Sequence, residues 1–64
     1  MYVVNWYIGS ISFHSKEFDT LSEAAKDAVW LYNDKKASFI TIDEGSTELW
    51  SLENDGIESI SKYL

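Results

Sequence analysis

The chain contains no cysteine, no proline and no arginine, and each absence narrows what the protein can be. Without cysteine, disulfides, thiolate metal sites and cysteine nucleophiles are excluded. Without proline and with only three glycines, the composition argues against a disordered linker. The absence of arginine and a formal net charge of −6 disfavour binding to a phosphate backbone. We therefore expect no nucleic-acid partner.

A chain of 64 residues allows one domain, residues 1–64, with one small core. A domain of this size buries only about 60% of the surface that its unfolded chain exposes. The sequence begins Met1-Tyr2-Val3-Val4-Asn5, with no basic region and no long apolar run after it. We expect neither a signal peptide nor a membrane partner, and a cytoplasmic location by default.

The charged residues are segregated along the chain. Residues 1–15 hold none, and residues 16–36 hold five acids and four lysines. Residues 37–61 hold six acids and no base. The second half therefore carries negative charge that no neighbouring cation in the sequence neutralises.

The N-terminal third predicts a β-hairpin. Residues 2–8 are rich in β-branched and aromatic types, and Gly9-Ser10 can form a two-residue turn before a second strand from Ile11. Such a turn pairs Ile8 with Ile11, Trp6 with Phe13 and Val4 with Ser15. This register places Val4, Trp6, Ile8, Ile11 and Phe13 on one face of the hairpin.

The clearest local signal is a helix start. Thr20-Leu21-Ser22-Glu23 fits the capping box, in which a threonine caps the helix and a glutamate follows three residues later. The apolar residues that follow gather on one helical face: Leu21, Ala24, Ala25, Ala28, Leu31 and Tyr32. We expect the helix to end near Asn33-Asp34, with Asn33 able to adopt the left-handed conformation.

Two more strands and a helical tail follow. Residues 37–43 and 47–52 read as strands joined by the turn at residues 43–46. Pairing Ile42 with Thr47 places Ile40 opposite Leu49 and Phe39 opposite Trp50. Ile57, Ile60 and Leu64 recur at helical spacing, which predicts a short C-terminal helix.

These elements predict an α+β fold of order ββαββ with a four-stranded antiparallel sheet. Residues 2–8 are uncharged and suit the centre, whereas Lys16-Glu17 and Glu48 suit edge strands. The strand order 2-1-3-4 satisfies both requirements, with one helix on one face and a short helical tail.

Catalytic and metal-binding signals are weak. His14 is the single histidine, and no nucleophile turn, phosphate loop or orienting acid accompanies it. Neither Asp43-Glu44 nor Glu53 with Asp55 has the spacing of a calcium loop. We expect a protein that is not an enzyme and that has no cofactor, metal site or catalytic residue.

Acidic residues are the candidate contacts for a partner. Glu23, Asp27 and Asp34 fall on one solvent-facing side of the predicted helix. Asp43, Glu44 and Glu48 lie in and after the third strand. A basic surface on another protein would relieve their repulsion. The alternative is a solvated surface that keeps a small domain soluble.

Trp30 adds a large apolar side chain to the charged face of the predicted helix. It can serve as a binding anchor, because tryptophan is enriched among interface residues that dominate affinity. Alternatively, Lys26 one turn earlier stacks on the indole.

The second face of the sheet also carries apolar residues: Val3, Tyr7, Phe39, Trp50 and Leu52. An apolar patch of this kind seldom stays bare on a monomer. Tyr7, Phe39, Trp50 and Leu52 are therefore dimerisation candidates. A partner or the tail with Ile57, Ile60 and Leu64 are the other possible covers.

In its short length, acidity, lack of cysteine and preference for lysine over arginine, the chain resembles the small acidic inhibitors that phages encode against host DNA- or RNA-handling enzymes. The resemblance is one of composition and carries over no functional residue. It implies a nucleic-acid-mimicking inhibitor that binds a basic surface of a host protein, in the host cytoplasm if the chain is phage-encoded. The alternative function is a homodimeric structural or accessory domain without inhibitory activity.

Overall fold

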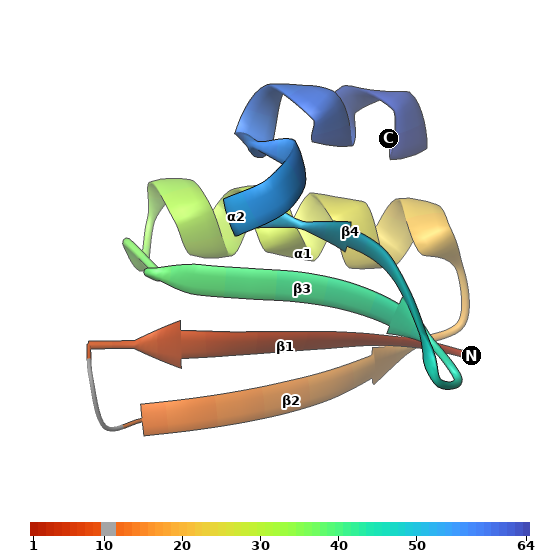
Figure 1. Ribbon diagram of the computed structural model, residues 1–64, viewed down its shortest axis with the longest axis horizontal. Helices are drawn as coiled ribbons and strands as arrows, with labels where there is room; N and C mark the ends of the chain where they lie inside the picture. The colour runs from red at the N-terminus through yellow and green to blue at the C-terminus, as the bar shows by residue number, and fades with distance from the viewer. Residues whose placement is uncertain (10–11) are drawn as a thin grey trace.

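The computed structural model describes residues 1–9 and 12–64 and contains a four-stranded antiparallel sheet of order β2-β1-β3-β4 (Figure 1). The elements are β1 (Tyr2–Ile8), β2 (Ser12–Phe18), α1 (Leu21–Asn33), β3 (Phe39–Glu44), β4 (Thr47–Ser51), α2 (Leu52–Asp55) and the 3₁₀ helix η1 (Ile57–Tyr63). The α+β class, the strand order and the helix after the second strand are confirmed.

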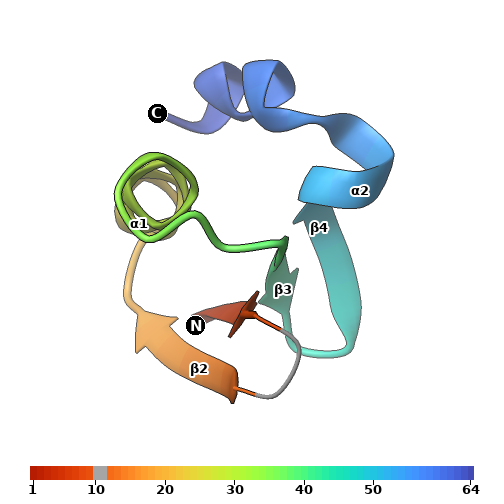
Figure 2. The same ribbon diagram turned by 90° about the vertical axis from the view of Figure 1, so that its left-hand side faces the viewer.

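All the helical segments lie on one side of the curved sheet (Figure 2). The helix α1 contacts β1, β2 and β3, and η1 packs against α1. The C-terminal segment therefore covers the helix side, and the prediction that Ile57, Ile60 and Leu64 could cover the second sheet face is wrong. That second face, called here the open face, has none of the helices of residues 1–9 and 12–64 over it.

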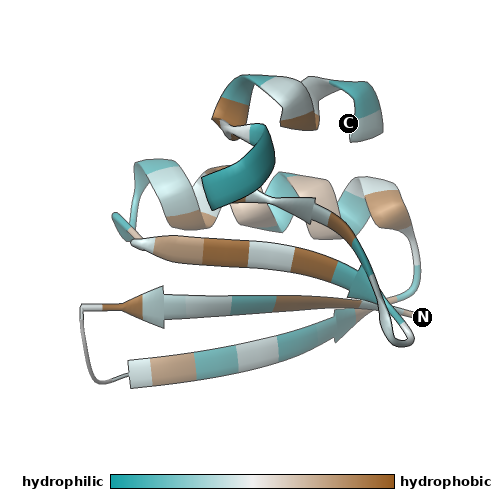
Figure 3. Ribbon diagram, viewed as in Figure 1, coloured by the Kyte–Doolittle hydropathy of each residue, from teal (hydrophilic) through white to brown (hydrophobic). Residues whose placement is uncertain are grey.

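The core lies between the sheet, α1 and η1. Its buried side chains are Val4, Ala24, Ala25, Ala28, Leu31, Ala37, Ile40, Ile42, Trp50 and Ile60. In Figure 3 the hydrophobic positions of the strands β1, β2 and β3 lie mainly on β1 and β3, whereas β2 is mostly pale or teal. Three alanines on one side of α1 let the helix approach the sheet closely, as the helical spacing predicted.

The predicted capping box opens α1. The Thr20 hydroxyl oxygen accepts a hydrogen bond from the Glu23 backbone N–H at 3.1 Å, and the hydroxyl donates to Glu23 Oε1 at 3.0 Å. The helix ends at Asn33, as expected, with Asp34 as its C-cap. The left-handed residue is Lys36, with φ 56°, and not Asn33.

The register of β1 against β2 differs from the prediction by one residue. Ile8 lies opposite Ser12, Tyr7 opposite Phe13 and Trp6 opposite His14. The predicted pairs Trp6–Phe13 and Val4–Ser15 are wrong, and the predicted pair Ile8–Ile11 lies outside the described residues. Because side chains alternate between faces, this shift moves Phe13 to the open face.

The register of β3 against β4 also differs. Ile42 lies opposite Trp50, and Asp43 opposite Glu48, so Leu49 is an extra residue that forms a β-bulge. The predicted pairs Ile42–Thr47, Ile40–Leu49 and Phe39–Trp50 are therefore wrong. The bulge changes the alternation along β4, and Trp50 joins the core while Glu48 lies beside Asp43.

The segment after β4 closes the core around Trp50. The indole N–H of Trp50 lies 2.9 Å from Ser59 Oγ and 3.2 Å from the Gly56 carbonyl, both of which accept from it. Ser51 ends the strand because its hydroxyl accepts from the Asn54 N–H at 2.9 Å and so caps α2. Leu52, predicted as the last residue of the strand, is the first residue of α2.

Candidate protein-binding face

The open face carries a row of three aromatic side chains near the start of β2. Tyr7 on β1 lies between Phe13 on β2 and Phe39 on β3, with ring centroids 4.9 Å and 5.5 Å away. Phe13 is 53% exposed and Tyr7 37% exposed, while Phe39 is partly buried. The three residues are called here the aromatic row.

A row of hydrogen-bonded polar side chains follows along the strands. The Ser15 hydroxyl donates to Asn5 Oδ1 at 2.6 Å. The Asn5 amide in turn donates to Thr41 Oγ1 at 3.3 Å and to Asp43 Oδ2 at 2.8 Å. Because one amide links three strands, these side chains are held in place before any partner arrives.

A third row is acidic. Val3 lies opposite Glu17 on one side and Asp43 on the other, and Asp43 lies opposite Glu48. Glu17, Asp43 and Glu48 are called here the acidic row. Like charges directly across a strand pair destabilise a sheet, so the Asp43–Glu48 pair costs stability in the free protein.

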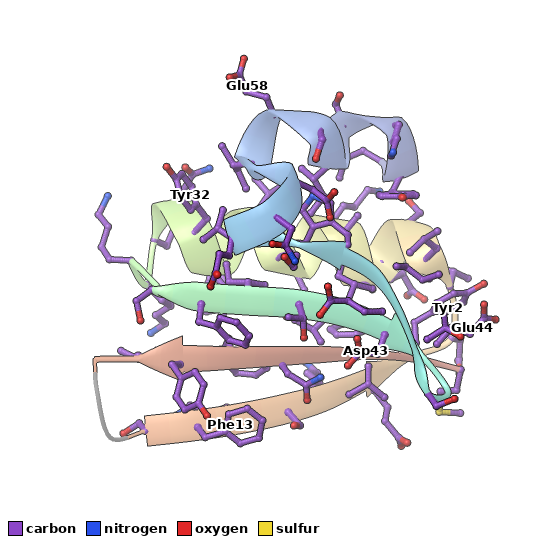
Figure 4. All side chains as sticks on the ribbon, in the orientation of Figure 1. Tyr2, Phe13, Tyr32, Asp43, Glu44 and Glu58 are labelled. Atoms are coloured by element: carbon purple, nitrogen blue, oxygen red, sulfur yellow. The ribbon has the colours of Figure 1, made fainter. Side chains whose placement is uncertain are left out.

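The aromatic and acidic rows lie at opposite ends of the open face. Figure 4 shows Phe13 near the start of β2 and Asp43 near the far end of β3. Tyr7 belongs to the aromatic row, and Val3 is the β1 residue that lies between Glu17 and Asp43 of the acidic row. Tyr7 and Val3 are four positions apart in β1. At about 3.4 Å per residue, the two rows are separated by about 14 Å.

The predicted site on α1 is divided by the structure. Trp30 is 47% exposed, and the cation over its ring is Lys35, with Nζ 5.3 Å from the ring centroid, rather than the predicted Lys26. Glu23 takes part in the helix cap, and Asp34 is the exposed C-cap. Trp30, Glu23 and Asp34 are all exposed, on the side of the molecule that carries the helices.

Asp27 does not share the solvent-facing side of the helix that the spacing predicted. It is half-buried, and its Oδ2 atom is buried without a hydrogen-bond partner among residues 1–9 and 12–64. Burial raises the pKa of Asp27 above its ordinary value, and the charge of Lys16 on β2 partly opposes that rise. The helical spacing placed Asp27 in solvent because it did not take into account that α1 packs over β2.

Of the five residues predicted on the second face, Val3, Tyr7 and Phe39 lie there, whereas Trp50 and Leu52 do not. Tyr7 and Phe39 lie in the aromatic row. Trp50 is only 1% exposed and belongs to the core, while Leu52 lies on α2 and packs against that core. Phe13 was missed because a two-residue turn put it on the opposite face. A predicted hairpin with a loop one residue longer would have placed Phe13 opposite Tyr7 on the open face.

Asp43, Glu44 and Glu48 lie together at the β3–β4 turn, as the sequence suggested. Glu44 lies opposite Tyr2 and Thr47, and Figure 4 shows Tyr2 and Glu44 close together at that end of the sheet. Glu58 lies at the other side of the molecule, on η1 (Figure 4). The acids of the second half therefore do not form one surface, and the turn cluster is the part that adjoins the open face.

The described residues offer little evidence for a catalytic or metal-binding site. His14 is exposed and stacks on Trp6, with ring centroids 5.3 Å apart. Within residues 1–9 and 12–64 there is no pocket and no group of three potential metal ligands. The same residues include no helix with the length and apolar character needed to cross a membrane.

Comparison with protein-family models, curated proteins and solved structures finds no match.

Proposed function

We propose that the protein is a small acidic protein-binding module that occupies a cationic surface of a DNA- or RNA-handling protein and so inhibits nucleic-acid binding there. The observation that carries the proposal is the acidic row together with Glu44. The three carboxylates of the acidic row lie at one end of the open face, and Glu44 lies opposite Tyr2 at the same end of the sheet, in a chain whose residues 37–61 contain no base.

Electrostatics supports a cationic partner. Asp43 and Glu48 face each other across β3 and β4, and Glu17 lies two strands from Asp43 in the same row. Neutralising these charges from outside removes their mutual repulsion, so a cationic surface gains from binding here. A field of one sign also accelerates the encounter of oppositely charged partners and makes association sensitive to salt.

The test is capture followed by competition. The immobilised chain is incubated with lysate, and bound proteins are eluted either with a short DNA or RNA duplex or with an uncharged polysaccharide. We expect nucleic-acid-handling proteins to be released by the duplex and by raised salt, and not by the polysaccharide. Each captured protein is then assayed for loss of oligonucleotide binding as the chain is added.

Two outcomes would contradict the proposal. One is a set of captured proteins that the duplex cannot displace. The other is a partner that binds the chain equally well at low and high salt, because exposed charge pairs are screened over about 10 Å at 0.1 M salt.

A homodimeric accessory domain is the second candidate, and the exposed aromatic row is the observation that favours it. Sedimentation distinguishes the two functions. A tight dimer that protects Tyr7 and Phe39, in a chain that inhibits no nucleic-acid-binding protein, would establish the second function and exclude the first.

A further inference from the structure

We infer that the open face is the docking surface and that its occupant is a basic protein segment carrying one apolar side chain. The inference rests on the proposed function and assigns it to the sheet rather than to the α1 surface around Trp30. It concerns six residues: Phe13, Tyr7 and Phe39 in the aromatic row, and Glu17, Asp43 and Glu48 in the acidic row.

The aromatic row provides the apolar half of the surface. The Tyr7 ring lies against both Phe13 and Phe39, so the three rings form one continuous patch rather than separate exposed side chains. The described helices lie on the other side of the sheet (Figure 2), and Phe13 and Tyr7 are 53% and 37% exposed. Aromatic side chains lose little conformational entropy when they are covered, which makes them effective anchors for a partner.

The acidic row determines the charge of the occupant. The Asn5 amide donates to Asp43 Oδ2, and the Ser15 hydroxyl donates to Asn5 Oδ1. These hydrogen bonds fix the Asp43 carboxylate on the sheet. A lysine or arginine of the partner therefore meets an acid that is already positioned, and little side-chain entropy is lost.

The same charges disfavour a second copy of this chain on the open face. Each copy carries a net charge of −6. Sheet-to-sheet packing would place the acidic row of one copy against either the acidic row or the rings of the other. Repulsion between equal charges, or their burial against aromatic rings, opposes both arrangements.

The spacing of the rows specifies the segment. An extended chain rises about 3.4 Å per residue, so an apolar residue and a cation four positions later span the separation of about 14 Å. The peptide Leu-Ser-Thr-Ser-Lys-Lys has this spacing. Two control peptides replace either its leucine or both of its lysines with serine.

The experiment is a titration of the ¹⁵N-labelled full chain with these peptides, followed by NMR. We expect the first peptide to shift amide signals of β1 and β3 and to leave those of α1 in place, and each control peptide to bind more weakly. Phe13→Ser and Asp43→Asn should each reduce affinity by about tenfold. Trp30→Ser is the matched control, because it removes an aromatic ring of similar exposure, and it should bind like the wild type.

The possible failures are distinguishable. Shifts confined to α1, or affinity lost in Trp30→Ser and retained in Phe13→Ser and Asp43→Asn, would move the site to α1 and leave the proposed function standing. Absence of any shift on the open face would overturn the inference. Open-face signals that change on dilution without peptide would assign the face to a second copy. Binding that is independent of salt would contradict the proposed function itself.

Discussion

Two tryptophans of this chain have opposite roles. Trp50 is 1% exposed, and its indole N–H has two acceptors in the segment that follows β4. Trp30 is 47% exposed, and the Lys35 ammonium lies over its ring. Hydrophobicity alone does not separate these two residues in the sequence. The difference comes from the bulge at Leu49, which places Trp50 in the core.

Trp50→Phe should lower the free energy of unfolding by about 2 kcal/mol, because it leaves a cavity and removes a buried hydrogen bond. Urea unfolding followed by circular dichroism measures the change. Trp30→Phe is the matched control and should change stability by less than about 0.5 kcal/mol, as expected for an exposed site. Equal losses in the two variants would show that Trp50 is not the central core residue.

Asp27→Asn tests the half-buried carboxylate. Because folding raises the pKa of Asp27, its contribution to stability is complete below its ordinary value of 3.8 and is lost as the pH rises through the raised folded value. The variant should therefore be more stable than the wild type at neutral pH. Solvent screening at a half-exposed site limits the gain to less than about 1 kcal/mol.

The measurement for Asp27→Asn is urea unfolding of both proteins from neutral to acidic pH. The stability difference should shrink as the pH falls through the carboxyl range. A difference that stays constant with pH, or a variant that is less stable at neutral pH, would mean that attraction to Lys16 outweighs the burial of the carboxylate.

At the scale of elements, local signals in the sequence were sufficient for the helix and for the strand order. The capping box at Thr20 and the alternation of charged and uncharged strands both depend on residues close in the chain. The strand registers could not be predicted, because they depend on the lengths of the turns and on a bulge. Gly9 is compatible with loops of different length, and no residue type at Leu49 identifies a bulge. The β1–β2 register differs from the prediction by one residue, and the β3–β4 register differs by two residues before the bulge and by three after it. The two odd shifts moved Phe13 and Trp50 to the other face.

Thr20→Ala removes the cap of α1 and should cost about 1 kcal/mol of stability. Thr20→Ser keeps a hydroxyl that can accept from the Glu23 N–H, so it should retain most of that energy. Thermal unfolding of the three proteins compares them directly. If serine were as damaging as alanine, the threonine methyl group rather than the cap would be the stabilising feature.

At the scale of the whole molecule, the excess of acids should make stability depend on ionic strength. Sodium chloride screens the repulsion in a chain of net charge −6, so the midpoint of thermal unfolding should rise from low to moderate salt. Glu48→Lys places a cation opposite Asp43 and should be stabilised at low salt by up to about 1 kcal/mol.

Glu48→Gln is the matched control for that salt series, because it removes the negative charge without adding a positive one. Its midpoint should lie between those of the wild type and Glu48→Lys at low salt, and the three should converge as salt is added. A wild-type midpoint that falls with added salt would show that attraction between charges, rather than repulsion, dominates this fold.

The bulge at Leu49 also makes the two edges of the sheet unequal. On β4 it interrupts the regular ladder, and α2 begins immediately after Ser51, so this edge is a poor template for an additional strand. The long, exposed β2 is the regular edge, and Lys16 and Glu17 place charges along it. Any growth of the sheet into larger aggregates would therefore start from β2, where those two charged side chains act against it.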